Sequence, residues 1–134
     1  MSSHPETTVL WEKKLAANPR SLVFSRLADS YRKKGDVQRA IDICVEGLEN
    51  NPRYVTGRII LARCYLEQEN FQNAIEEFRK VCKYDRHNQI AIKMLADVFA
   101  KQSMEDKAGD LYALLRKMDP ENSSLSHLSR VYQP

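Results

Sequence analysis

The residues of this chain that could take part in chemistry are few, and they do not gather into a recognisable site. The three histidines, His4, His87 and His127, are far apart, and none has zinc-ligand spacing to a cysteine or an acidic residue. No glycine-rich phosphate loop, nucleophile elbow or His-Glu-x-x-His pattern occurs in the sequence. We therefore expect no enzyme activity, no catalytic residue, no metal site and no cofactor.

The cysteines are better explained by packing than by reactivity. Cys44 and Cys82 fall on apolar stripes, where a thiol packs as a small hydrophobic group. With Cys64 they make an odd number without a close pair, which suits a reducing compartment. We expect a cytoplasmic protein, since the first eight residues are polar and lack the apolar core of a signal peptide.

Charge is nearly balanced and spread along the whole chain. The 21 basic and 18 acidic residues give a net charge of +3, and the two signs alternate instead of clustering. This argues against a dedicated nucleic-acid or membrane surface, and no apolar run approaches the ~20 residues that span a bilayer. Adjacent acids such as Glu76-Glu77 are expected on polar helix faces, solvated or paired with basic residues such as Lys80.

The strongest signal is a repeat with a period of 34 residues. Four columns recur in three copies, as expected when one structural unit is repeated. They are Leu27, Leu61 and Leu95; Ala28, Ala62 and Ala96; Tyr31, Tyr65 and Phe99; and Ala40, Ala74 and Ala108.

Each copy reads as two helices joined by a tight turn. In the first copy, Ser21 is expected to cap a helix from Leu22 to Lys34, and Gly35 to end it in a left-handed conformation. Asp36 then caps a second helix. Its apolar residues fall on one face at helical spacing: Val37, Ala40, Ile41, Cys44 and Leu48.

This pattern resembles the tetratricopeptide repeat (TPR), a helix–turn–helix unit that ends in proline. The resemblance covers residues 21–120. It implies an all-α fold of antiparallel helix hairpins, stacked as a right-handed superhelix of three TPR motifs behind an N-terminal capping helix. The departures are Arg58 for a large apolar residue, Arg86 for the terminal proline, and Glu69 and Ser103 at the counterpart of Gly35.

We expect a single TPR domain over residues 1–134. A capping helix, supported by the apolar residues Leu10, Trp11 and Leu15, covers the open face of the first repeat. After the third repeat, Leu125, Leu128 and Val131 suggest a cap, but the serines among them weaken helix formation. The expected segments are 4–17 for the capping helix, 21–54, 55–88 and 89–122 for the three repeats, and 123–134 for a short tail or partial cap.

The TPR resemblance also implies where a partner would bind. In such repeats the first helices line a concave groove that holds a peptide. Register places these residues there: Leu22, Ser25, Arg26, Asp29 and Lys33; Thr56, Ile59, Ile60, Arg63 and Glu67; Ile90, Lys93, Met94, Asp97 and Lys101. Basic residues outnumber acidic ones, with apolar residues between them, so an amphipathic or mildly acidic partner is the expected complement.

Two qualifications follow from the same residues. Ile59 and Ile60 cannot both face inward to the same degree, so one of them is a candidate core residue. The charged residues have an alternative role, because Asp29, Arg63 and Asp97 could pair with one another across neighbouring repeats.

The carboxylate clamp of co-chaperone TPRs is not expected. That clamp uses a Lys/Asn/Asn/Lys/Arg set, and none of the matching residues here agrees with it. They are Ser25, Asp29, Ile60, Ile90 and Met94.

The leading hypothesis is a non-enzymatic scaffold that binds a partner peptide or domain through the concave groove. The alternative is a self-associating structural TPR protein, a homo-oligomer that uses its tail or the incompletely capped end around Leu111, Leu115 and Met118. Nucleic-acid binding is a weaker third hypothesis, because the aromatic residues lie mostly in packing columns and leave few for base stacking.

Overall fold

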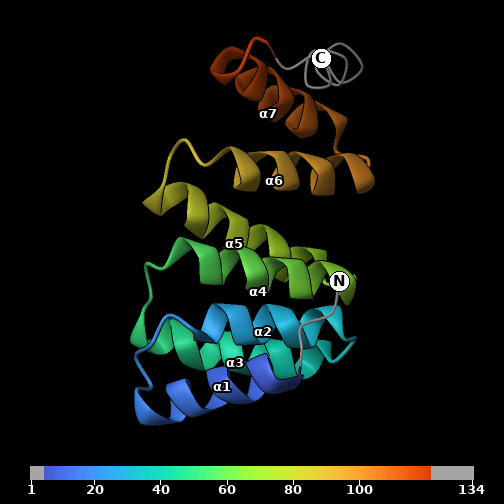
Figure 1. Cartoon of the computed structure of the whole chain (residues 1–134). Helices are drawn as coiled ribbons and strands as arrows, with labels where there is room; N and C mark the ends of the chain where they lie inside the picture. The colour runs from blue at the N-terminus through green and yellow to red at the C-terminus, as the bar shows by residue number, and fades with distance from the viewer. Residues whose placement is uncertain (1–4, 122–134) are drawn as a thin grey trace. The chain divides into compact units, whose positions relative to one another are not determined.

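A computed structural model of the chain describes residues 5–121, and every regular element within that range is an α-helix. The all-α class expected from the sequence is therefore confirmed (Figure 1). The expected tail at 123–134 lies outside the described residues. The helices are α1 Pro5–Ala17, α2 Phe24–Lys33, α3 Val37–Asn50, α4 Val55–Glu67, α5 Phe71–Tyr84, α6 Gln89–Lys101 and α7 Glu105–Met118.

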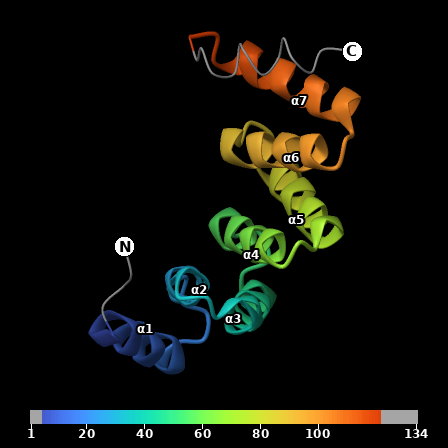
Figure 2. The same cartoon turned by 90° about the vertical axis from the view of Figure 1, so that its right-hand side faces the viewer.

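The described residues form two compact units, residues 5–80 and residues 81–121. In the first unit α2 packs against both α3 and α4, and α1 lies beside α2 (Figure 2). In the second unit α6 packs against α7. The pairs α2–α3 and α6–α7 follow the helix–turn–helix order that the 34-residue period predicts.

The turn between α2 and α3 forms largely as expected, whereas the start of α2 differs. Gly35 has a φ of 91°, which is the predicted left-handed conformation, and the Asp36 carboxylate accepts a hydrogen bond from the Arg39 N–H at 3.3 Å. The prediction that Ser21 caps a helix starting at Leu22 is wrong. The Ser21 hydroxyl accepts from the Val23 N–H within a preceding turn, so the helix begins only at Phe24.

The same turn geometry recurs where glycine is absent. Glu69 and Ser103 take φ values of 57° and 62°, a region that L-residues other than asparagine and aspartate seldom occupy. After Glu69 the Asn70 N–H donates to the Tyr65 carbonyl, as the Asp36 N–H does to that of Tyr31. The hairpin geometry is therefore kept at the expense of backbone strain.

The core of the first unit is built around Phe24, whose ring is fully buried. Two glycines make room for this ring. A Cβ atom at Gly47 would lie 2.2 Å from the ring, and one at Gly57 would lie 2.6 Å from it. Both glycines are helical, so close packing explains their presence.

An ion pair occupies the second repeat where the other repeats have apolar residues. Arg58 is 9% exposed and Glu77 is 7% exposed, and their side chains meet at 2.8 Å. The Arg58 Nε also donates to the Pro52 carbonyl at 2.8 Å. Of the two roles expected for Glu77, solvation is wrong, because Arg58 holds its carboxylate inside the unit. Pairing with Lys80 is confirmed, at 3.4 Å.

In the second unit, α6 and α7 pack through residues of the predicted columns. Leu95, Phe99 and Tyr112 are buried there, and the Tyr112 hydroxyl donates a hydrogen bond to the Asp97 carboxylate. The self-association hypothesis placed Leu115 at an incompletely capped, exposed end, which is wrong for this residue, since Leu115 is only 1% exposed. The neighbouring Leu114 is exposed instead. Leu115 is therefore not available for self-association.

The capping helix α1 is held by both polar and apolar contacts. The Thr8 and Ser30 hydroxyls lie 3.4 Å apart, and the Tyr31 hydroxyl donates to the Glu12 carboxylate. Leu15 packs against the core of the first unit. Thus α1 covers one side of α2, as the sequence pattern predicts.

Candidate peptide-binding surface

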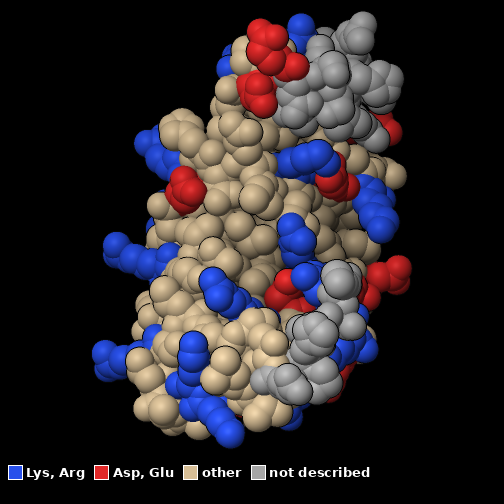
Figure 3. All heavy atoms as spheres, in the orientation of Figure 1, with Lys and Arg blue, Asp and Glu red and all other residues tan. Residues whose placement is uncertain are grey.

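The first helices of repeats one and two place the predicted groove residues on one face of the first unit. We call this the α2–α4 face and define it by Leu22, Arg26, Asp29, Lys33, Thr56, Ile59, Arg63 and Glu67. Leu22 is 46% exposed, Arg26 and Thr56 are exposed, and Ile59 is half-buried. Figure 3 shows basic side chains, fewer acidic ones and uncharged surface between them in the region of α2 and α4. The face is therefore amphipathic.

Two residues placed in the groove by register contribute less to it. Ser25 is 2% exposed, and its hydroxyl donates to the Leu22 carbonyl at 3.0 Å, so it does not face a partner. Ile60 packs against the core of the first unit, which resolves the choice between the two isoleucines in favour of Ile59 as the surface residue.

The acidic side chains of the α2–α4 face already have partners. Arg32 contacts the Asp29 carboxylate at 2.8 Å and the Glu67 carboxylate at 2.6 Å, and so joins α2 to α4. Lys33 contacts Asp29 at 3.3 Å. Arg32 was not among the predicted groove residues, although its position three residues after Asp29 is a signal for helical pairing.

These contacts stabilise the charged state of Asp29. Burial alone would raise the pKa of its carboxyl, but hydrogen bonds and charge attraction from Arg32 and Lys33 outweigh burial, and the pKa is lowered. Burial would lower the pKa of the Arg32 guanidinium, but hydrogen bonds and charge attraction from Asp29 and Glu67 outweigh burial, and the pKa is raised. Asp29 therefore remains ionised. It pairs with Arg32 and Lys33 of its own helix, and not with Arg63, the pairing that the sequence left open.

Two arginines on this face are left without acidic partners. Within residues 5–121, the Arg26 side chain makes no ion pair or hydrogen bond. The Arg63 Nε is buried and has no hydrogen-bond partner in that range. A buried N–H without an acceptor costs about 1–3 kcal/mol. Because the Nε atom itself is not accessible, a partner would meet Arg63 through the exposed part of its half-buried side chain.

The remaining predicted groove residues lie on α6, in the second unit. Ile90 is the most exposed large apolar side chain among them, and Met94 is half-buried. Lys93 contacts Asp97 at 3.0 Å within α6, and Asp97 also accepts from Tyr112, so Asp97 does not pair across repeats. Lys101 is exposed at the end of α6.

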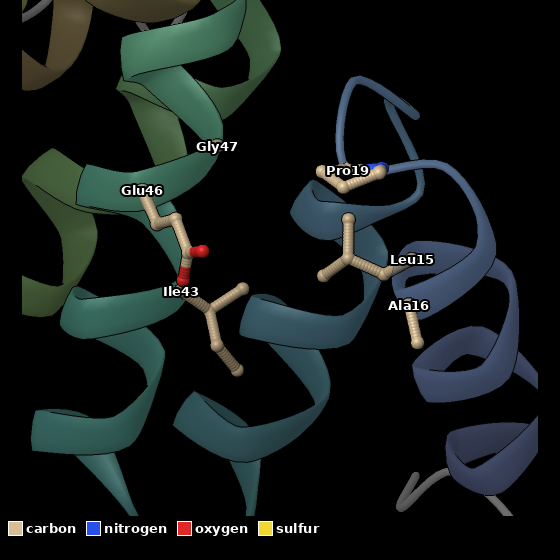
Figure 4. Close-up of a pocket in the computed structure, with 6 residues that line it drawn as sticks. All are labelled: Leu15, Ala16, Pro19, Ile43, Glu46 and Gly47. Atoms are coloured by element: carbon tan, nitrogen blue, oxygen red, sulfur yellow. The ribbon is translucent and has the colours of Figure 1, made fainter.

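Two hollows mark the surface of the first unit near α1. The first has a volume of about 410 Å³, and we call it the turn pocket; its lining consists of Lys14, Ser21, Leu22, Val23, Arg26 and Tyr54. The second, of about 190 Å³, is mostly apolar and lies between α1 and α3 (Figure 4). Leu15 and Ile43 point into it from opposite sides. Its volume suits one large side chain, not a peptide.

The described residues offer little that could catalyse a reaction. Within 5–121 no group of three or more histidine, cysteine or acidic side chains could hold a metal ion. Burial raises the pKa of the Cys64 thiol to about 12 and also raises that of Cys44 and Cys82, so these thiols are weak nucleophiles. None of the helices in this range is long and apolar enough to cross a membrane.

Comparison with protein families gives a match over residues 6–81. The matching family is described as anaphase-promoting complex, cyclosome, subunit 3. Among curated proteins, mouse sperm-associated antigen 1 is 24% identical over 123 residues, which are 90% of this chain and 14% of that protein. The chain thus corresponds to about one seventh of the length of this relative.

Solved structures of TPR proteins share the fold. MamA superimposes with a TM-score of 0.83 at 17% identity, covering 93% of this chain and 74% of MamA. The first TPR of Spaghetti (RPAP3), bound to the HSP90 peptide SRMEEVD, has a TM-score of 0.76 at 18% identity and covers 85% of this chain and 90% of its own. These likenesses confirm an all-α helical-repeat fold.

Proposed function

The chain belongs to the TPR family described as anaphase-promoting complex, cyclosome, subunit 3, and we propose that its α2–α4 face binds an amphipathic, mildly acidic segment of a partner protein. TPR neighbours include a peptide-bound domain, which supports an interaction scaffold as the general function. We propose further that the protein acts without catalysis and works in the cytoplasm, where its three thiols stay reduced.

The observation that carries this proposal is the pairing pattern of the α2–α4 face. Asp29 and Glu67 are neutralised by Arg32 and Lys33, whereas Arg26 and Arg63 lack acidic partners within the described part of the chain. Acidic side chains of a partner would complement these arginines, and aliphatic ones would cover exposed apolar residues such as Leu22.

The partner peptide of the Spaghetti TPR offers a parallel. It contains three acidic residues. Here, however, the positions that would form a co-chaperone carboxylate clamp do not carry its residues: Ser25, Asp29, Ile60, Ile90 and Met94. Recognition of acidic groups in this chain would therefore depend on other side chains, with Arg63 as the central one.

A random dodecapeptide display library provides the test. Peptides selected on the wild-type protein should be enriched in Asp and Glu interspersed with Leu, Ile or Val. Their binding should be lost with the Arg26→Glu/Arg63→Glu variant and kept with the control Arg79→Glu/Lys83→Glu, which reverses two exposed charges on α5.

Circular dichroism should show unchanged helicity in both variants, and Arg63→Gln supplies a milder change if Arg63→Glu perturbs folding. Selected peptides that bind the reversed face as tightly as the wild type would refute the assignment of the α2–α4 face. The absence of any enriched sequence would refute peptide binding itself.

A further inference from the structure

The turn pocket is built from three segments that meet at one end of the α2–α4 face. Lys14 comes from the last turn of α1, Arg26 from the first turn of α2, and Tyr54 immediately precedes α4. Both cationic side chains are exposed, and neither makes an ion pair or hydrogen bond within residues 5–121. The lining contains no acidic residue, so the pocket is a cationic hollow without an internal counter-charge.

Its remaining lining adds donors and an apolar wall. The Ser21 hydroxyl oxygen accepts from the Val23 N–H at 3.2 Å, which leaves its own proton free to be donated. Within residues 5–121, the Tyr54 hydroxyl has only a long contact of 3.4 Å with the Ser25 hydroxyl. Leu22, nearly half exposed, forms the apolar side.

This combination selects one ligand chemistry. Two cations and two hydroxyl donors around an aliphatic wall match a carboxylate carried on a short methylene stem. Resting on the proposed function, we propose that the turn pocket holds the carboxylate of an Asp or Glu side chain of the peptide bound on the α2–α4 face. The capping helix α1 then contributes a recognition residue, Lys14, in addition to covering the first repeat.

The pocket constrains the direction in which the peptide binds as well as the charge that the peptide must carry. Arg63 lies on α4, two turns into the helix, whereas the turn pocket lies at the start of α2. A partner that satisfies both sites needs two acidic residues separated along its sequence, with an aliphatic residue against Leu22. A single acidic residue would satisfy only one of them.

The test uses a peptide selected on the wild-type protein, labelled with a fluorophore and titrated by anisotropy. Lys14→Met and Arg26→Met should each weaken binding about fivefold, the upper range for a partly exposed ion pair. Lys13→Met is the matched control, because Lys13 is an exposed neighbour on α1 that does not line the pocket, and it should change the affinity less than twofold.

A second arm identifies the carboxylate. A peptide in which one acidic residue is changed to its amide should bind the wild type more weakly, by more than the loss caused by Lys14→Met alone. The same peptide change should cost less affinity on the Lys14→Met variant than on the wild type, because only the contact with Arg26 remains to be lost. Amidation of the peptide C-terminus should have no comparable effect. A loss caused by amidation instead would overturn the assignment to a side chain.

The outcomes also separate this inference from the proposed function. Peptides that depend on Arg63 but respond equally to Lys14→Met and Lys13→Met would overturn the turn pocket and leave the α2–α4 face intact. Failure to select any peptide that depends on Arg63 would overturn both.

Discussion

The buried pair Arg58–Glu77 offers a sharp test of what holds the second repeat together. It occupies two columns that are apolar in the other repeats. Phe24 and Ile92 match Arg58 in register, and Leu111 matches Glu77. The double variant Arg58→Ile/Glu77→Leu would therefore give the second repeat the residues found in the third.

The single changes should be costly, for reasons visible in the contacts. Glu77→Leu leaves a 9%-exposed guanidinium without its carboxylate, and breaking a buried pair in this way costs about 3–5 kcal/mol. Arg58→Ile should cost less, about 2–3 kcal/mol, because Lys80 remains 3.4 Å from the Glu77 carboxylate.

The double change should be far milder than either single change. Replacement of a buried pair by apolar residues of similar volume is neutral or stabilising by about 1–4 kcal/mol. Loss of the hydrogen bond from Arg58 to the Pro52 carbonyl removes about 1 kcal/mol of this gain. The double variant should therefore be within about 1 kcal/mol of the wild type or more stable, with a coupling energy of at least about 3 kcal/mol.

Urea denaturation followed by far-UV circular dichroism measures these free energies of unfolding. Glu76→Gln, at the exposed neighbouring position, is the control and should change stability by less than about 0.5 kcal/mol. If Glu77→Leu unfolds the protein, Glu77→Gln gives a measurable substitute. A double variant whose loss equals the sum of the single losses would show that the two side chains act independently and would refute the argument.

Three further predictions follow from the backbone, the packing and the thiols. Glu69→Gly and Ser103→Gly should each raise the unfolding free energy by about 0.5–1 kcal/mol in urea titrations, because both residues have positive φ; a loss of stability would contradict this. Gly47→Ala should lower the melting temperature, since its Cβ would lie 2.2 Å from the Phe24 ring, and Phe24→Leu in the same chain should recover part of the loss. Burial raises the pKa of Cys64 to about 12, so stability is fully present below the unfolded pKa of about 9 and should fall as pH rises above it; a Cys64→Ala variant should lose less over that window.

Much of the fold could be predicted because four packing columns, those of Leu27, Ala28, Tyr31 and Ala40, are kept in all three copies of the repeat. Alanines such as Ala28 and Ala40 recur at the period and are buried, and Gly35 and Asp36 mark the turn as expected. The start of α2 was missed because Ser21 can form either a helix cap or a local turn with the same hydroxyl, and sequence alone does not decide between them.

The candidate site was less predictable, because register gives the direction of a side chain but not its partners. Ser25 has the right position for the groove, yet its hydroxyl bonds back to its own helix and is buried. From sequence, Arg58 is a departure from the repeat pattern and Glu77 a surface acid, because the two residues are 19 positions apart and lie on different helices, α4 and α5. Only the fold brings them together.

The same distinction decides how the charge of the α2–α4 face should be read. Arg26, Lys33 and Arg63 against Asp29 and Glu67 give the face a net charge of +1, and the neighbouring Arg32 raises it to +2. A diffuse charge of that size would attract acidic partners weakly and would be screened within about 10 Å at moderate salt. Because Arg32 draws both acids into one cluster, the excess is concentrated on Arg26 and Arg63 instead. Arg63 is half-buried whereas Arg26 is exposed, and salt screens partly buried charges less than exposed ones, so binding at Arg63 should be less sensitive to salt than binding at Arg26.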